Sequence, residues 1–191
     1  VTAHDRGQIV DTVNAYTGPM STQRAGRIPS DDLVRLCFSG KYTQQELLKL
    51  MNGGSGYKAY FGTQDARRVS ALMDAGDPLA KEVTDTLAYQ TSKAVAEMRI
   101  AAEHPVDRII ITGGMANFKY VTDYITRKVS FIAPVEILPG EFEMEALAEG
   151  ALAVLTGEES AREYDVLPAA YATVEAFYEF VRQQQAKSGQ H

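Results

Sequence analysis

The sequence has one cysteine, no excess of basic residues and no long apolar run. Cys37 cannot form a disulfide within the chain, so a reducing compartment, the cytoplasm, is the expected setting. The 19 Lys and Arg residues are outnumbered by 25 Asp and Glu, which argues against a nucleic-acid-binding face. No apolar run approaches the roughly 20 residues of a membrane-spanning helix, so no membrane partner is expected. A soluble, globular protein is expected, since 45% of the 191 residues are hydrophobic and 23% are charged.

Common catalytic and ligand-binding motifs are also missing from the sequence. There is no Cys-x-x-Cys or His-Glu-x-x-His motif, and His4, His104 and His191 are isolated, so no zinc site is expected. No Ser-His-Asp or Cys-His set is evident. The glycines fit neither the dinucleotide pattern G-x-G-x-x-G nor a P-loop. The sequence opens on "VTAHDRG" with no initiator Met and no signal peptide, which predicts a piece of a longer protein.

The hydrophobic pattern of the later part of the chain predicts alternating strands and helices. Buried-type strands at 108–112 and 134–138 each precede a helical pattern, at 118–128 and 143–155. This βαβα order predicts parallel strands with right-handed crossovers. Pro168 is expected to open a final helix with an aromatic stripe, and the last residues are expected to fray.

The earlier part of the chain predicts a hairpin followed mainly by helices. Asp5, Arg6 and Gly7 are expected near the hairpin turn. Ser30 is expected to cap a short helix on whose apolar face Cys37 is most simply a core residue. Thr43 opens the next helix with Glu46 at the capping-box position. The longest helix is expected from about residue 79 to 103.

The turn "TGG" of residues 112–114 follows the first of these parallel strands. In an open α/β sheet, ligands bind beyond the carboxyl ends of the strands, and glycines let a ligand approach the backbone. The next helix would offer free N–H groups and a positive dipole end. The alternative is a tight turn with nothing bound.

A second candidate is Arg24, in a loop punctuated by Gly18, Pro19 and Gly26. Arginine can stabilise charge on a transferring phosphoryl group through several fixed donors. The alternative is a solvated loop arginine.

The third candidate is "GTQDARR", in which Gly62 leads into Asp65 and Arg67. These residues can touch a nucleotide or its phosphates. The alternative is a helix N-cap by Thr63 or Asp65, with the arginines solvated.

The fourth candidate is "PGEFEMEAL", in which Glu141, Glu143 and Glu145 lead into a helix. A carboxylate beside a phosphate can hold Mg²⁺ through its oxygens. The alternative is an ordinary favourable interaction of acids with the helix dipole.

These candidates belong to stretches that occur in one order along residues 1–164: "GPMSTQRAG", "DLVRLCFSGKYTQQEL", "AYFGTQDAR", "AYQTSKAV", "ITGGMA", "VSFIAPVEILPGEFEMEALAEGAL" and "GEESAREY". Together they resemble the C-terminal half of the butyrate kinases, a branch of the acetate kinase family within the sugar-kinase and actin-like ATPase superfamily. The long runs make the resemblance specific, whereas the short motifs alone would not.

The resemblance implies a reversible kinase that passes the γ-phosphoryl of ATP to butyrate or a similar short-chain carboxylate, giving ADP and an acyl phosphate. Arg24 matches the arginine that stabilises the transferring phosphoryl group. Glu145 matches the acid that positions Mg²⁺, with Glu143 as the alternative in a neighbouring register.

The same resemblance implies the nucleotide site. Gly113 and Gly114 match adenosine-binding glycines, and Met115 beside them completes that part of the expected site. Asp65 and Arg67, with Gly62 before them, match residues near the nucleotide and its phosphates. "MANF" departs from the acetate kinase pattern after the glycines, so later adenosine contacts do not carry over.

The implied fold is a ribonuclease H-like α/β domain with a mixed sheet and helices on both faces. Residues 1–164 are expected to be the C-terminal nucleotide-binding domain, and residues 165–191 an extra helix and tail. A missing N-terminal domain would supply a second phosphate loop, so the chain is expected to be inactive alone, and the whole protein to be a homodimer. The alternative is a free-standing ATP-binding or interaction module without kinase activity.

Overall fold

The computed structural model describes residues 1–140, 142–161, 179 and 182. The chain divides into two units, residues 1–142 and 143–191, and each is described by itself. The expected helix after Pro168, with its aromatic stripe, and the expected boundary at residue 164 lie outside the described residues. Among the helices that are described, none has both the length and the hydrophobicity of a membrane span.

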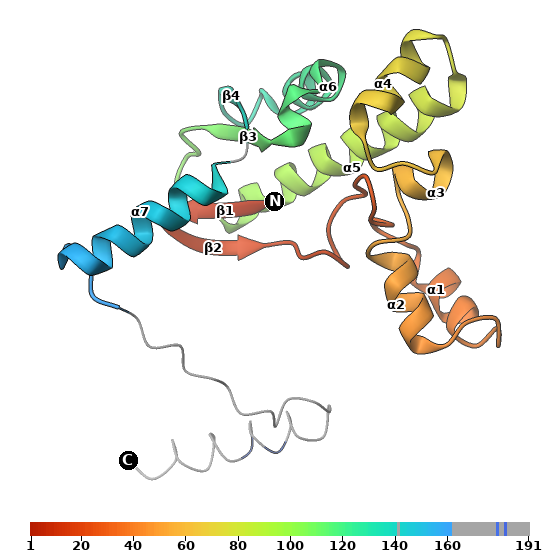
Figure 1. Ribbon diagram of the computed structural model, residues 1–191, viewed down its shortest axis with the longest axis horizontal. Helices are drawn as coiled ribbons and strands as arrows, with labels where there is room; N and C mark the ends of the chain where they lie inside the picture. The colour runs from red at the N-terminus through yellow and green to blue at the C-terminus, as the bar shows by residue number, and fades with distance from the viewer. Residues whose placement is uncertain (141, 162–178, 180–181, 183–191) are drawn as a thin grey trace. The chain divides into compact units, whose positions relative to one another are not determined.

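The first unit contains four strands, six α-helices and one 3₁₀-helix among its described residues (Figure 1). In chain order they are β1 (Thr2–Asp5), β2 (Gln8–Thr12), α1 (Ser30–Cys37), α2 (Gln44–Met51), α3 (Tyr57–Phe61), α4 (Ala66–Asp74), α5 (Pro78–Ala101), β3 (Ile109–Gly113), η1 (Gly114–Asn117), α6 (Lys119–Val129) and β4 (Val135–Pro139). The described part of the second unit contains α7 (Glu143–Thr156).

The strands pair in both senses. β1 and β2 form the expected antiparallel hairpin, whose turn residues Arg6 and Gly7 have φ of 49° and 78°. β3 and β4 pair in parallel, as predicted, with Ile109 opposite Val135. Among the described residues these pairs form two separate two-stranded sheets rather than one mixed sheet.

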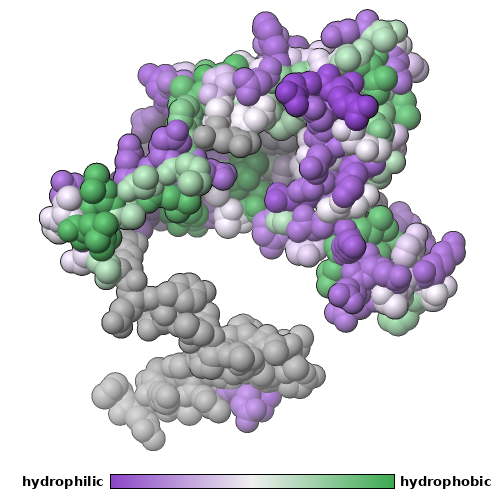
Figure 2. Space-filling view, in the orientation of Figure 1, coloured by the Kyte–Doolittle hydropathy of each residue, from purple (hydrophilic) through white to green (hydrophobic). Residues whose placement is uncertain are grey.

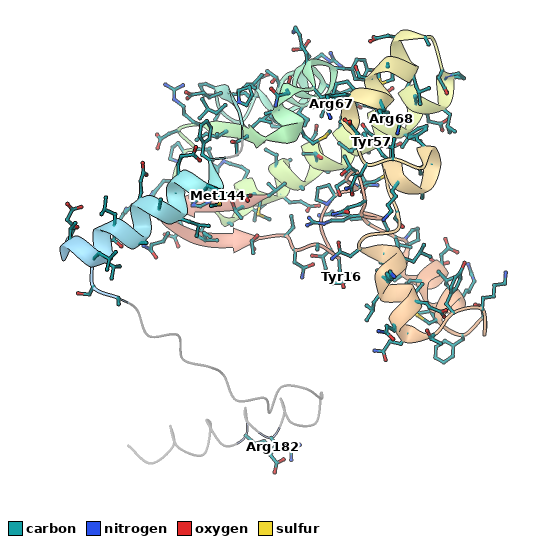
Figure 3. The ribbon with its side chains drawn as sticks, viewed as in Figure 1. Tyr16, Tyr57, Arg67, Arg68, Met144 and Arg182 are labelled. Atoms are coloured by element: carbon teal, nitrogen blue, oxygen red, sulfur yellow. The ribbon has the colours of Figure 1, made fainter. Side chains whose placement is uncertain are left out.

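Helix α5 is the central element of the first unit, and it packs against the β1–β2 hairpin, α4 and α6 (Figure 1). Its buried positions include Val83, Thr84 and Leu87. The fully buried Tyr57 of α3 reaches this helix, and its hydroxyl donates a hydrogen bond to Thr84 Oγ1 at 3.0 Å (Figure 3). Burial of the ring raises the pKa of Tyr57. α5 therefore helps to hold the hairpin, α3, α4 and α6 in place.

The helix starts follow local side-chain chemistry. Thr43 and Glu46 form the predicted capping box of α2. Asp77 caps α5 by accepting from Leu79 N and Ala80 N at 2.8 and 3.1 Å. Ser30 does not cap α1, because the helix begins at Ser30 itself and Pro29 occupies the cap position.

Helix α1 differs from its sequence-based interpretation in a second respect. Cys37, expected in the core, is exposed, and α1 has no buried residue. Its apolar side chains form a face, but Val34 and the adjacent Phe38 are 55% and 87% exposed. An apolar helical period predicts that one side of a helix can be buried, and it does not show that a partner element lies there.

Helix α7 is apolar along much of its length, with Leu147, Leu152 and Leu155 among its hydrophobic residues (Figure 2). Glu143 and Glu145 lie in its first turn. Acidic side chains there interact favourably with the positive end of the helix dipole.

Candidate functional site

Arg24 lies in the loop of residues 18–27, here called the arginine loop, which joins the hairpin to α1. One side of this loop is bonded through backbone atoms to residues 51–58. Ala25 N donates to Met51 O at 2.9 Å, and Lys58 N donates to Thr22 O at 3.0 Å. Arg24 itself pairs with Asn52 in an isolated antiparallel bridge. These bonds hold the backbone on both sides of Arg24.

The other side of the arginine loop is bonded to α5 through side chains. Gln90 Oε1 accepts hydrogen bonds from Met20 N at 2.9 Å and from Arg27 N at 3.3 Å. The Arg27 guanidinium forms a two-pronged ion pair with the Glu97 carboxylate. Hydrogen bonding to Arg27 lowers the pKa of Glu97, and that to Glu97 raises the pKa of Arg27.

A cavity of about 230 Å³ brings two of the predicted sites together. Arg24 lines it from the arginine loop, and Thr112 and Met115 line it from the end of β3 and from η1. The remaining wall is mostly apolar, with Leu87 of α5 and Ile125 of α6 among its residues. A mostly apolar wall with a few convergent polar groups is the kind of lining found in small-molecule sites.

The Gly113–Gly114 turn has room for a ligand on its backbone. Gly113 has φ of 82°, a conformation that favours glycine, and a Cβ built on it would meet nothing within 4 Å. The helix predicted over residues 118–128 is α6 (Lys119–Val129), and the 3₁₀-helix η1, which the sequence did not indicate, lies between it and the strand. The N–H groups nearest the glycines therefore belong to η1 rather than to an α-helix.

Gly62, Asp65 and Arg67 lie at the junction of α3 and α4, and none of them lines the cavity that Arg24 and Met115 share. Gly62 ends α3 in the left-handed conformation, with φ of 66°. Asp65 caps α4 by accepting from Arg67 N at 3.0 Å, and its carboxylate also accepts from the Arg67 guanidinium. These bonds, from the side chain first and then from the backbone, lower the pKa of Asp65.

This local pairing fits the structural alternative considered for "GTQDARR". Arg67 is 91% exposed at the start of α4, beside Arg68 (Figure 3). A cap and an exposed ion pair account for the geometry without a ligand. A role of Asp65 and Arg67 at a nucleotide stays a prediction.

Glu143 and Glu145 are exposed carboxylates in the second unit, two residues apart in the first turn of α7. Carboxylate oxygens are ligands that Mg²⁺ prefers. In the described part of the chain, no group of three or more His, Cys, Asp or Glu side chains is arranged to hold a metal by itself. The donor set therefore fits a metal that takes one or two carboxylates and completes its coordination with phosphate oxygens and water.

The structure adds residues that sequence reasoning missed. Gln90 and Glu97 hold the arginine loop, although they are distant from it in sequence. Gln90 lies within the stretch "AYQTSKAV", which carries the family resemblance but no recognised motif. Asn14, Ser21 and Thr91 add polar groups to the cavity wall.

Solved structures of short-chain carboxylate kinases share this fold. A propionate kinase from Francisella tularensis subsp. tularensis SCHU S4 superposes with a TM-score of 0.61 at 26% identity, over 68% of this chain and 35% of that structure. An acetate kinase from Porphyromonas gingivalis superposes with a TM-score of 0.65 at 18% identity, over 73% of this chain and 41% of that structure, and shows the fold alone.

The family model of the acetokinase family matches residues 1–169, and the chain belongs to that family. Butyrate kinase 2 of Clostridium acetobutylicum is 49% identical over 166 residues, which are 86% of this chain and 47% of that protein. A probable butyrate kinase of Clostridium botulinum is 41% identical, with the same coverage. The chain thus spans about half the length of the curated relatives it matches.

Proposed function

We propose that the chain is the C-terminal, nucleotide-binding half of a butyrate kinase. The reaction is the reversible transfer of a phosphoryl group from ATP to butyrate, which gives butyryl phosphate and ADP. The observation that carries the proposal is the cavity shared by Arg24 and Met115, in a chain of the acetokinase family. The 49% identity to Butyrate kinase 2 supports the choice of butyrate among short-chain carboxylates.

Arg24 stabilises the negative charge of the phosphoryl group during its transfer. Phosphoryl transfer requires positioning and charge neutralisation rather than a covalent nucleophile on the protein. Arg24 is exposed at the cavity, and it has no ion-pair partner within the described residues, so its guanidinium donors are available to an oxyanion.

The turn of Gly113, Gly114 and Met115 holds the adenosine of ATP or ADP. The space over Gly113 and the cavity beside Met115 support this role. Gly62, Asp65 and Arg67 lie nearer the phosphates. For Arg67 to reach a phosphate, it must exchange the Asp65 carboxylate for a phosphate oxygen, and its high exposure permits that movement.

Glu145, or Glu143 in the neighbouring register, helps to position Mg²⁺ with the nucleotide phosphates. Bound Mg²⁺ would neutralise part of the phosphate charge. The chain's own contribution is a carboxylate at the start of α7, where helix N–H groups also favour anionic groups.

The complete enzyme places this half opposite an N-terminal domain across a nucleotide-binding cleft. In this complete enzyme, residues 1–164 form a ribonuclease H-like domain, in which the two strand pairs belong to one mixed sheet with helices on both faces. Residues 165–191 are an appended segment. The 47% coverage of Butyrate kinase 2 supports a partner domain in the same polypeptide. We further propose a homodimer that acts in the cytoplasm.

A substrate panel on the full-length protein tests the function. Phosphoryl transfer from ATP is measured with butyrate, isobutyrate, propionate and acetate under the same conditions. Butyrate is expected to give the highest kcat/KM, and each methylene of difference is worth about 1–3 kcal/mol. Activity highest on acetate would contradict the assignment of butyrate, and ATP binding without transfer to any carboxylate would favour the non-catalytic module.

A further inference from the structure

Gln90 joins the arginine loop to α5 at two points that bracket Arg24. Its Oε1 atom accepts from Met20 N, four residues before Arg24, and from Arg27 N, three residues after it. The loop after β2 runs beside α5 in Figure 1, in agreement with these bonds. One side-chain oxygen therefore ties the beginning and the end of the segment that presents Arg24.

The bond from Gln90 to Met20 is partly shielded from water. Met20 is 6% exposed, and its hydrogen bond to Gln90 is partly buried. A buried backbone N–H that loses its acceptor destabilises the conformation that buries it. If Gln90 lost its acceptor oxygen, the loop would have to move until Met20 N met water or another acceptor.

Gly26 and Gln90 fit each other closely. Gly26 is buried with φ of 78°, and a Cβ on it would overlap Gln90 Oε1 and lie 2.5 Å from Met20 N. The glycine therefore leaves the space that the Gln90 amide fills. The close fit allows Oε1 to reach both N–H groups at once.

The two sides of the arginine loop are held by different means. The bonds to residues 51–58 join backbone to backbone and do not depend on particular side chains. The bonds to α5 depend on two side chains, Gln90 and the exposed Glu97. An exposed ion pair contributes little and is screened by salt, so Gln90 supplies the more specific restraint.

We infer that Gln90 is a positioning residue for Arg24, acting through the backbone of the arginine loop and not by touching the substrate. The inference rests on the proposed function, because it takes Arg24 as the group that stabilises the transferring phosphoryl. A small displacement of such a group lowers the rate of transfer far more than it weakens binding of the ground state.

The test measures phosphoryl transfer in the full-length enzyme with Gln90→Met, Gln90→Glu and a control. Gln90→Met removes the acceptor and keeps the side-chain length. We expect kcat to fall by about 10- to 100-fold, with the KM for ATP changed by less than about threefold. Gln90→Glu keeps the acceptor and is expected to retain most of kcat. The control is Gln45→Met, the same change at an exposed position of α2 away from the loop.

A double-mutant cycle with Arg24→Ala separates positioning from a general loss of structure. If Gln90 acts through Arg24, then Gln90→Met has little further effect on kcat once Arg24 is removed. Circular dichroism checks that each variant is folded. If Gln90→Met does not fold, Gln90→Asn replaces it, because the asparagine amide is too short to reach the loop.

Four results would count against the proposals. An equal loss of kcat from Gln90→Met with and without Arg24 would overturn the positioning role, as would full activity of folded Gln90→Met beside an inactive Arg24→Ala. A KM increase for ATP without a kcat loss would do the same. Unchanged turnover by Arg24→Ala would instead refute the role of Arg24 in the proposed function, and the role of Gln90 with it.

Discussion

At the scale of single residues, Arg24 differs from Arg67 and Arg35 in its surroundings and not in its charge. Arg24 and Arg67 are both exposed arginines in the candidate set, but Arg67 is ion-paired to the cap of its own helix, whereas Arg24 faces a cavity. Arg35 resembles Arg67, since it is paired with Asp31 and Asp32 on α1. An arginine paired on the surface, such as Arg35, is therefore a suitable control for a substitution of Arg24.

In the full-length enzyme, Arg24→Ala is expected to lower kcat by about 10²-fold or more, because it removes the guanidinium proposed to stabilise the transferring phosphoryl group. Arg24→Lys should recover only part of that loss, since lysine keeps the charge but lacks the guanidinium fork. Initial-rate kinetics with butyrate and ATP measure both. Arg35→Ala is the control and should retain kcat, while a comparable loss in both alanine variants would mean that the effect is not specific to the cavity.

The ion pair of Arg27 and Glu97 predicts a pH dependence of stability. The folded pKa of Glu97 is lowered by its hydrogen bonds to Arg27, so the pair stabilises the fold above the unfolded pKa of about 4.3. The stabilisation is lost as the pH falls through the lowered folded pKa. It should be small and sensitive to salt, because the Glu97 side chain is 44% exposed.

Urea unfolding of the wild-type and Glu97→Gln forms measures this effect at two pH values. At about pH 7 the wild-type protein should be the more stable of the two, and the difference should be smaller at about pH 3, below the unfolded pKa of Glu97. An unchanged difference at the lower pH would show that Glu97 contributes through packing rather than through its charge.

The sequence indicated Arg24 and the glycine turn as candidate site residues, but it gave no signal for Gln90. Arg24 and the glycine turn lie in stretches that carry the family resemblance, and arginine and glycine are residue types that often contact phosphates and nucleotides. Gln90 is an ordinary residue on α5, and its proposed role comes from a contact with Met20, 70 residues away. Such a contact leaves no local pattern of spacing or composition, so only the folded structure reveals it.

At the scale of secondary-structure elements, α5 supports both the core and the arginine loop. Its start is defined by Asp77, whose side chain accepts from two N–H groups of the first turn. Gln90 and Glu97 lie further along the same helix. Stability of the start of α5 and activity at the arginine loop can therefore be affected separately, since the cap is remote from Gln90 in the helix.

Asp77→Ala is expected to lower the free energy of unfolding by about 1 kcal/mol, the usual cost of losing an N-cap. Asp77→Ser, which keeps a capping oxygen, should restore most of it. Urea denaturation measures both changes, and the m-value should stay constant. In the full-length enzyme the kcat of Asp77→Ala should remain near that of the wild type at a temperature where it is folded; equal stability of the alanine and wild-type forms would rule out a stabilising cap.

Local chemistry predicted the elements better than it predicted their surroundings. The capping box at Thr43, the hairpin turn and the parallel β3–β4 pair are confirmed, because each depends on residues close in sequence or on a strong strand pattern. The prediction that Cys37 lies in the core is wrong, and the 3₁₀-helix after Gly113 was not predicted at all. Whether a face is covered, and how a turn joins a helix, depends on tertiary contacts that propensity does not contain.

At the scale of the whole molecule, the chain holds one side of a proposed nucleotide cleft. Arg24, Met115 and the glycine turn belong to the first unit, and α7 with its acids begins the second. The cavity of about 230 Å³ is smaller than the roughly 300–1,000 Å³ of typical ligand pockets. Most of the contacts to ATP phosphates would then come from the proposed N-terminal domain.

Calorimetric titration with Mg-ATP tests this division between the two halves. We expect the present chain to bind Mg-ATP weakly and the full-length protein to bind it at least about tenfold more tightly, because half of the cleft contributes only part of the binding free energy.

Gly113→Val in the full-length protein should weaken Mg-ATP binding, since a branched side chain would fill the space over the turn and disfavour its φ of 82°. Gly40→Val is a matched control, because Gly40 also has a positive φ and open space but follows α1, away from the cavity. Equal affinities of the chain and the full-length protein would show that this half contains the complete nucleotide site, whereas equal weakening by both glycine variants would attribute the effect to backbone strain.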